Sequence, residues 1–155
     1  VMYFTLMKNI MWDDWERTVD VNCKGTMYGV GAVLPQMIRK GQGHIINITS
    51  DAGRKAFAGL GVYSGSKFFV EGMSQALRLE TADTGVRVTC IQPGNVATPL
   101  LATSTDAEGM KAYGEPSGAK VLDPEDVGRA VVYAASQPEW CAVNEILVEP
   151  RQEPA

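Results

Sequence analysis

The chain has 155 residues, 45% of them hydrophobic and 21% charged, which is the composition of one globular domain of ordinary size. This excludes a disordered tail, a collagen-like repeat and a disulfide-rich miniprotein, and no apolar run approaches the roughly 20 residues that span a membrane. The 14 basic and 18 acidic residues give a net charge of −4, so we expect neither nucleic acid nor an anionic membrane as a partner.

Helical periodicity begins at about Trp12 and continues to about Arg39. Three closely spaced glycines in this segment each lower the helix propensity by about 1 kcal/mol relative to alanine. The segment is therefore either a helix against which another backbone packs closely, or a kinked helix. The candidates for its buried face are Trp15, Val19, Val30 and Leu34.

Three short runs predict β-strands, and the first two are rich in Ile and Val, as in strands buried on both faces of a parallel sheet. These runs are His44 to Ile48, Val86 to Ile91 and Asn144 to Val148. Helices are predicted between them, so that helices and strands alternate along the chain. Alternation of this kind implies an α/β fold with right-handed crossovers and a parallel sheet covered on both faces.

The second predicted helix runs from Tyr63 to Thr81, and Val70, Met73 and Leu77 recur on one stripe of it. The third helix has the clearest start signal and should run to about Ser136. Its predicted N-cap is Asp123, followed by Pro124 at the first helical position and by Glu125 and Asp126 at the positive end of the helix dipole.

An open parallel sheet binds ligands beyond the carboxyl ends of its strands. The segments that follow the three predicted strands are Thr49-Ser50, Gln92-Pro-Gly-Asn95 and Glu149-Pro150. We therefore expect the functional site among these residues.

Tyr63 and Lys67 are four positions apart near a helix start, so they lie on one helix face. A phenol exchanges protons poorly at neutral pH, and a nearby ammonium favours the phenolate and lowers the phenol's pKa. The pair alone is weak, because a surface tyrosine and an unrelated solvated lysine give the same spacing.

Two strand ends add to this pair. Ser50 could donate a hydrogen bond to a carbonyl oxygen, although its commoner role at such a position is a turn or cap. The segment from Pro93 to Thr98 predicts a sharp turn that brings backbone groups near a flat ligand, or else a simple loop.

Together these residues carry a family resemblance. The chain resembles the C-terminal part of a short-chain dehydrogenase/reductase, in which four motifs occur in the same order and at similar separations. Within that family it looks most like the NADP-dependent branch that acts on serine and other 3-hydroxy acids. The motifs are Asn22-Cys-Lys-Gly25, Ile45-Ile-Asn-Ile-Thr-Ser50, Tyr63-Ser-Gly-Ser-Lys67 and Pro93-Gly-Asn-Val-Ala-Thr98.

The resemblance implies a Rossmann-like doubly wound parallel sheet and a role for each matching residue. Tyr63 would be the general acid/base and Ser50 would polarise the carbonyl. Lys67 would lower the pKa of Tyr63 and bind the nicotinamide ribose, and Asn22 would hold a water that links Lys67 to solvent. An alternative for Asn22 is an amide that bonds backbone at a helix irregularity. The nicotinamide ring and its carboxamide would contact Pro93, Gly94, Val96 and Thr98.

The resemblance also implies a cofactor and partners. NADP(H) is favoured and NAD(H) is the alternative, a small alcohol or carbonyl compound is the substrate, and no metal is expected. A homo-oligomer would form through the helices at Trp12 to Arg39 and Tyr63 to Thr81, with Met27 and Tyr28 suited to that interface or equally to the core. Residues 99–120 would form a mobile lid over the substrate, or else a disordered surface loop.

The glycine-rich turn that holds the pyrophosphate in this family has no match here. We therefore expect residues 1–155 to be a single, incomplete domain that lacks its N-terminal cofactor-binding half of about 90 residues. The chain also begins without an initiator methionine or a signal peptide. The strand at Ile45 to Ile48 would then be an unpaired sheet edge.

The three cysteines Cys23, Cys90 and Cys141 are widely spaced, with only His44 as a further soft ligand. We expect neither a disulfide framework nor a zinc site, but three buried, reduced thiols in a cytoplasmic protein. His44 lies at the start of a strand, away from Ser50, which argues against a serine hydrolase triad.

Two functional hypotheses remain. One is the catalytic part of an NAD(P)(H)-dependent oxidoreductase that interconverts a secondary alcohol and a ketone. The other is a truncated, non-catalytic family member that acts only through helix-mediated association.

Overall fold

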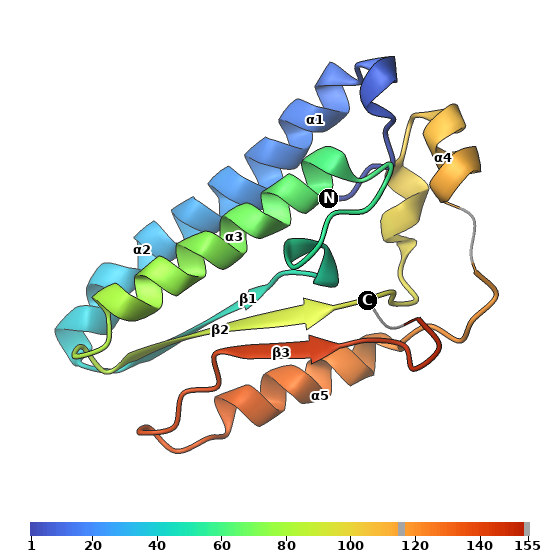
Figure 1. Ribbon diagram of the computed structural model, residues 1–155. Helices are drawn as coiled ribbons and strands as arrows, with labels where there is room; N and C mark the ends of the chain where they lie inside the picture. The colour runs from blue at the N-terminus through green and yellow to red at the C-terminus, as the bar shows by residue number, and fades with distance from the viewer. Residues whose placement is uncertain (115–116, 154–155) are drawn as a thin grey trace.

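The structure is a computed structural model that describes residues 1–114 and 117–153, and a three-stranded parallel sheet lies at its centre (Figure 1). The strands are β1 (Gly43–Ile48), β2 (Val86–Pro93) and β3 (Glu145–Val148). They are hydrogen-bonded in the order β1-β2-β3, and both pairs are parallel. The predicted strands and the α/β class are confirmed, and β2 continues two residues beyond the prediction.

The first helical segment is continuous but irregular. It consists of α1 (Trp12–Thr18), the π-helix η2 (Val19–Lys24) and α2 (Gly25–Lys40). The irregularity lies before the glycines, and a Cβ built on Gly29 or Gly31 meets no atom within 4 Å. Close packing of another backbone at these two glycines is therefore not observed in the part of the chain that the structure describes.

The predicted buried face of this segment is correct in three of four positions. Trp15 is buried, and Val30 and Leu34 pack against the core beneath α2. Val19, however, is 41% exposed. The prediction for Val19 is wrong. It assumes that the 3.6-residue period of an α-helix continues through Val19, but the wider π-helix begins at this residue.

The second and third helices form as predicted. The second is α3 (Gly61–Glu80), which buries Val70 and Leu77. The third is α5 (Pro124–Ala135), in which the Asp126 carboxylate accepts a hydrogen bond from the Asp123 backbone at 2.9 Å, one half of a capping box.

Helices cover both faces of the sheet (Figure 1). On one face α2 contacts β1 and α3 contacts β2, whereas α5 contacts β2 and β3 on the other. Each fully buried aliphatic side chain in such a core contributes about 1.5–3 kcal/mol of hydrophobic free energy. The cluster between the sheet and α2 and α3 comprises Ile45, Leu77 and Val88, with Val30, Leu34 and Met37 packed against it.

β1 lies at one end of the strand order, so its outer edge has no strand partner among the described residues. Ile48, the last residue of β1, is accordingly half exposed. This is the strand at which the sequence predicts an unpaired sheet edge.

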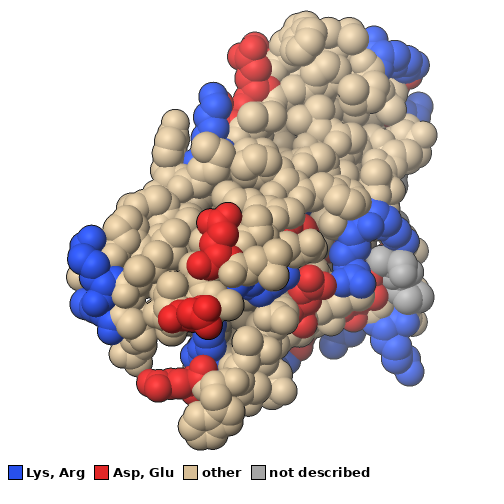
Figure 2. All heavy atoms as spheres, turned by 60° about the vertical axis from the view of Figure 1, so that its left-hand side comes forward, with Lys and Arg blue, Asp and Glu red and all other residues tan. Residues whose placement is uncertain are grey.

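The cysteines differ from the prediction in one respect. All three are free thiols, but only Cys23 and Cys90 are buried. Cys141 is half-buried, because it lies in the loop after α5 and not in the core. Across residues 1–114 and 117–153, no helix has both the length and the hydropathy needed to cross a membrane. On the face seen in Figure 2, basic and acidic side chains lie in several separate groups.

Candidate active site

A cavity of about 610 Å³ lies beyond the carboxyl ends of β1 and β2. This is the position expected for a ligand site in an open parallel sheet. Seven of the eight predicted site residues line it. They are Ser50, Tyr63, Lys67, Pro93, Gly94, Val96 and Thr98.

Ser50 lies two residues beyond the end of β1 and is buried. Its hydroxyl donates to Asp51 Oδ1 at 2.8 Å and accepts from the Ala52 backbone at 3.1 Å, which caps the short helix η3 (Asp51–Gly53). Ser50 therefore fulfils the capping role that was its alternative, and the residue also lines the cavity.

Tyr63 lies in the first turn of α3 and packs against Phe4, Ala52 and Leu60. Burial raises the pKa of its phenol, and the negative charge of Asp51 acts in the same direction. Hydrogen bonding with Ser50 opposes these effects. Tyr63 is thus a neutral phenol at neutral pH and can donate a proton.

Lys67 lies one helical turn beyond Tyr63, with its ammonium 5.5 Å from the centre of the Tyr63 ring. The ammonium donates to the Ile48 carbonyl at 3.1 Å, at the end of β1. Burial lowers the pKa of Lys67 to about 8, and the negative charge of Glu71 opposes that shift. The sequence predicts that Lys67 lowers the pKa of Tyr63, but the pKa of this phenol is raised, with burial as the largest cause.

Asn22 is the predicted site residue that does not line the cavity. It lies in the π-helix η2, where its amide bonds the Val1 backbone nitrogen and oxygen, each at 2.9 Å, and the Ser66 hydroxyl at 3.0 Å. This arrangement matches the alternative considered for Asn22, an amide that bonds backbone at a helix irregularity.

The turn after β2 forms a second wall of the cavity. The Gly94 backbone donates to the Val148 carbonyl at 2.8 Å. A Cβ on Gly94 would lie 3.2 Å from Pro150, so this glycine permits a close approach of the two strand ends. Thr98 accepts a hydrogen bond from the Leu100 backbone and caps η4 (Pro99–Thr103).

The residues expected to form a lid close a third side of the cavity. Their described part contains η4 and α4 (Ala107–Tyr113). Asp106 accepts hydrogen bonds from the Leu6 backbone, at 2.8 Å, and from the Asn9 amide, so α4 is anchored to the segment around η1 (Met7–Asn9). The disordered-loop alternative is therefore wrong for residues 99–114; residues 115–116 lie outside the described part.

Sequence reasoning missed an aromatic wall of the cavity, because no periodicity or motif connects its members. Phe4 and Tyr113, more than 100 positions apart, both lie against Gly59. Phe57 also packs against the cluster that contains Phe4 and Tyr63. Asp51 also lines the cavity. Burial raises the pKa of its carboxyl, and hydrogen bonds from the Ser50 hydroxyl and the Ala52 backbone oppose that shift.

The serine hydrolase arrangement is not formed. His44 lies near the amino end of β1, whereas Ser50 lies beyond its carboxyl end. His44 Nε2 lies 2.7 Å from the Thr89 hydroxyl.

The family resemblance would place the nicotinamide end of a dinucleotide in this cavity. Lys67 contributes a basic side chain to the cavity wall, and the turn at Pro93 and Gly94 contributes backbone and small side chains. The residues that would hold the pyrophosphate are not among those that line this cavity.

Comparison with known proteins agrees with this geometry. The sequence profile of the short chain dehydrogenase family matches residues 3–109. The chain is 64% identical over 154 residues to glycine betaine reductase ATRR of Emericella nidulans, matching 99% of this chain and 12% of that protein. It is 44% identical over 138 residues to an uncharacterized oxidoreductase of Staphylococcus aureus strain MW2, matching 89% of this chain and 55% of that one.

Among solved structures, the closed form of serine dehydrogenase complexed with NADP+ superposes with a TM-score of 0.88 at 34% identity. The alignment covers all of this chain and 63% of that one, so the chain spans less than two thirds of the length of these relatives. The motifs, the parallel sheet and the matched profile agree: the chain belongs to the short-chain dehydrogenase/reductase family of oxidoreductases.

Proposed function

We propose that the protein interconverts an alcohol and a carbonyl compound by hydride transfer, with NADP(H) as the favoured cofactor and Tyr63 as the general acid/base. The observation that carries the proposal is the convergence of Ser50, Tyr63 and Lys67 with the turn after β2 on one cavity. The NADP+ in the serine dehydrogenase structure supports the choice of cofactor, and NAD(H) is the alternative.

The raised pKa of Tyr63 suits carbonyl reduction, because a protonated phenol can give its proton to the carbonyl oxygen. The Ser50 hydroxyl would turn from Asp51 to donate to the same oxygen. Lys67 would bind ribose hydroxyls with its ammonium, while the cofactor supplies the hydride. Asn22 would serve the site from the π-helix, by holding a water between Lys67 and solvent.

The cavity wall further favours a substrate that carries a positive charge. Phe4, Phe57 and Tyr113 contribute aromatic side chains to the wall, and Asp51 adds a half-buried carboxyl group. Aromatic rings and a carboxylate together attract a quaternary ammonium group. The relative that is 64% identical is named for glycine betaine, which is such a compound. A 3-hydroxy acid would instead bring its carboxylate towards Asp51.

The first experiment replaces Tyr63 by phenylalanine in the whole protein and measures NADPH-dependent turnover and NADPH binding. Loss of the general acid should lower kcat by about 10²–10⁴-fold and leave the NADPH Kd within about threefold. Tyr113→Phe, in the same cavity, is the matched control and should keep its activity. Turnover of the Tyr63→Phe variant near that of the parent would overturn the assignment.

The same assay tests substrate charge with two aldehydes of equal shape. Betaine aldehyde has a quaternary nitrogen where 3,3-dimethylbutanal has a carbon atom. The cation should be favoured in kcat/KM by about 5–30-fold, the worth of 1–2 kcal/mol of cation–π attraction. Tyr113→Leu should reduce that ratio. Equal values for the two aldehydes in the parent enzyme would refute the charge preference.

The non-catalytic alternative makes a different prediction for the parent protein. A family member that acts only through helix-mediated association needs no cofactor site. Stoichiometric NADPH binding measured by calorimetry would therefore exclude it, whereas absence of binding would favour it over the oxidoreductase.

A further inference from the structure

A buried carboxylate lies beneath the candidate active site and does not line its cavity. Glu71 is on α3, one helical turn beyond Lys67, and only 5% of it is exposed. A carboxylate in such a position is costly unless hydrogen bonds satisfy it. Its partners therefore show what this residue holds in place.

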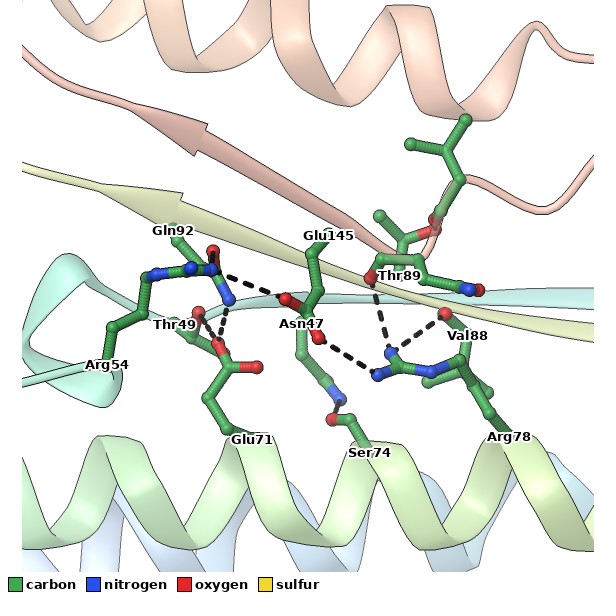
Figure 3. Close-up of polar contacts among 12 residues, drawn as sticks. Asn47, Thr49, Arg54, Glu71, Ser74, Arg78, Val88, Thr89, Gln92 and Glu145 are labelled. Carbon is green, nitrogen blue, oxygen red and sulfur yellow. Dashed lines mark hydrogen bonds and ion pairs between the residues drawn. The ribbon is translucent and has the colours of Figure 1, made fainter.

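One oxygen of Glu71 connects the ends of two strands (Figure 3). Its Oε1 accepts from the Thr49 hydroxyl at 2.5 Å and from the Gln92 amide at 2.9 Å. Thr49 immediately precedes Ser50, and Gln92 immediately precedes Pro93. A single atom on α3 thus binds the residues next to two members of the cavity wall.

The network continues from Gln92 to the segment after Ser50 (Figure 3). The oxygen of the Gln92 side chain accepts from Arg54 at 3.1 Å, and Arg54 follows η3. The fully buried Gln92 amide therefore donates to an anion and accepts from a cation, which fixes its orientation.

Close packing also joins η3 to this part of α3. A Cβ built on Gly53 would lie 3.0 Å from Glu71 Cγ and 3.2 Å from the Lys67 carbonyl. The segment that carries Ser50 thus rests directly on the helix turn between Lys67 and Glu71.

We propose that Glu71 is a positioning residue for the reaction. Through one carboxylate oxygen it holds Thr49, just after β1, and Gln92, near the end of β2, against α3. It thereby fixes Ser50, Lys67 and Pro93 relative to one another. The inference rests on the proposed function, in which these three residues act together. Misplacement of a reacting group by about 1 Å lowers turnover by about 10²-fold.

Two substitutions separate the hydrogen bonds of Glu71 from its charge. In Glu71→Gln the amide oxygen can take the place of Oε1 and accept both bonds, whereas Glu71→Leu removes the acceptor and leaves the Gln92 amide unpaired. Both changes remove the negative charge that raises the pKa of Lys67. Both should therefore move the alkaline limb of the activity profile to lower pH.

The matched control is Ser74→Ala on the same helix. Ser74 is fully buried and accepts from the Asn47 amide of β1 at 2.9 Å. Its hydroxyl also donates to the Val70 carbonyl and interacts with the Cys90 thiol, and none of these three partners is next to Ser50, Lys67 or Pro93 in sequence. Its loss should destabilise the same helix–sheet interface without disturbing the site.

The experiment measures kcat, KM, the pH profile, the melting temperature and the NADPH stoichiometry of each variant in the whole protein. Per bound NADPH, Glu71→Leu should lose about 30–100-fold in kcat, with both KM values within about threefold of the parent. The kcat of Glu71→Gln should stay within about threefold of the parent value. Ser74→Ala should keep the kcat and the pH profile of the parent. If Glu71→Leu matches Ser74→Ala in kcat and pH profile, Glu71 is structural only and the inference fails. Failure of the proposed function appears separately, as turnover that survives Tyr63→Phe.

Discussion

Tyr63 and Lys67 show how burial governs the chemistry of single side chains. Their spacing of four positions predicts a shared helix face and a shared cavity, and both are observed. The spacing does not predict their protonation, because the burial of Tyr63 depends on packing with residues such as Phe4, which lies 59 positions away in the sequence. Burial raises the pKa of Tyr63 and lowers that of Lys67, so each shifts towards its neutral form.

The pKa of Lys67 predicts a pH dependence of cofactor binding. Lys67 loses its charge as the pH rises through about 8, and an uncharged amine binds ribose hydroxyls less well than an ammonium. NADPH affinity, measured by calorimetry between pH 7 and 10, should therefore weaken above about pH 8. Lys67→Met should bind weakly at every pH and lack this inflection. A parent affinity that does not change over this range would contradict the prediction.

The contribution of Lys67 to the free energy of unfolding should rise with pH, whereas NADPH affinity should fall. The pKa of Lys67 is lower in the folded protein than its ordinary value of 10.5. Between about pH 8 and that value the unfolded chain binds more protons, so this residue makes the protein more stable as the pH rises. Lys67→Met should accordingly melt at a higher temperature than the parent at pH 7, and the difference should shrink towards pH 10.

The helices and strands follow from periodicity and caps to within one or two residues at most ends. The parallel pairing follows from their alternation, since a helix between two strands of one sheet imposes a crossover. The π-helix η2 does not follow from the sequence, because a single wide turn changes no residue type. It is also the element that carries Asn22, the predicted site residue that does not reach the cavity.

The link between α3 and β2 depends on one glycine. Gly85 has φ +76°, and a Cβ on it would lie 2.0 Å from the Gly41 carbonyl oxygen. Gly85→Ala should therefore lower the free energy of unfolding by about 3 kcal/mol or more, measured by urea denaturation. Gly41→Ala is the control. Gly41 also has a positive φ of +65°, but a Cβ there meets no atom within 4 Å. The free energy of unfolding should therefore fall by only about 1 kcal/mol in this variant. Equal losses for the two variants would disprove the steric argument.

The site as a whole depends on contacts across the length of the chain. The Phe4 backbone donates to the Ser104 hydroxyl, and Lys8 pairs with Glu108, each across about 100 positions. The motifs from Ile45 to Thr98 predict which residues line the cavity, since they lie at predicted strand and helix ends. They do not predict that residues 1–10 and α4 close it, because this depends on how distant segments pack.

The exposed aromatic side chains of α2 and α3 lead to the prediction for assembly. Tyr28 is 69% exposed, and Phe68 and Phe69 are each 40% exposed or more, so Tyr28 is not part of the core and remains suited to an interface. A stable dimer buries about 800 Å² per partner, and a lysine introduced there would be desolvated without a partner. Tyr28→Lys combined with Phe69→Lys should therefore lower the mass measured by light scattering to that of a monomer. The control is Tyr133→Lys, because Tyr133 is 57% exposed on α5, across the sheet. This substitution should leave the mass unchanged. A monomer from Tyr133→Lys, with the mass of the double variant unchanged, would place the interface on α5.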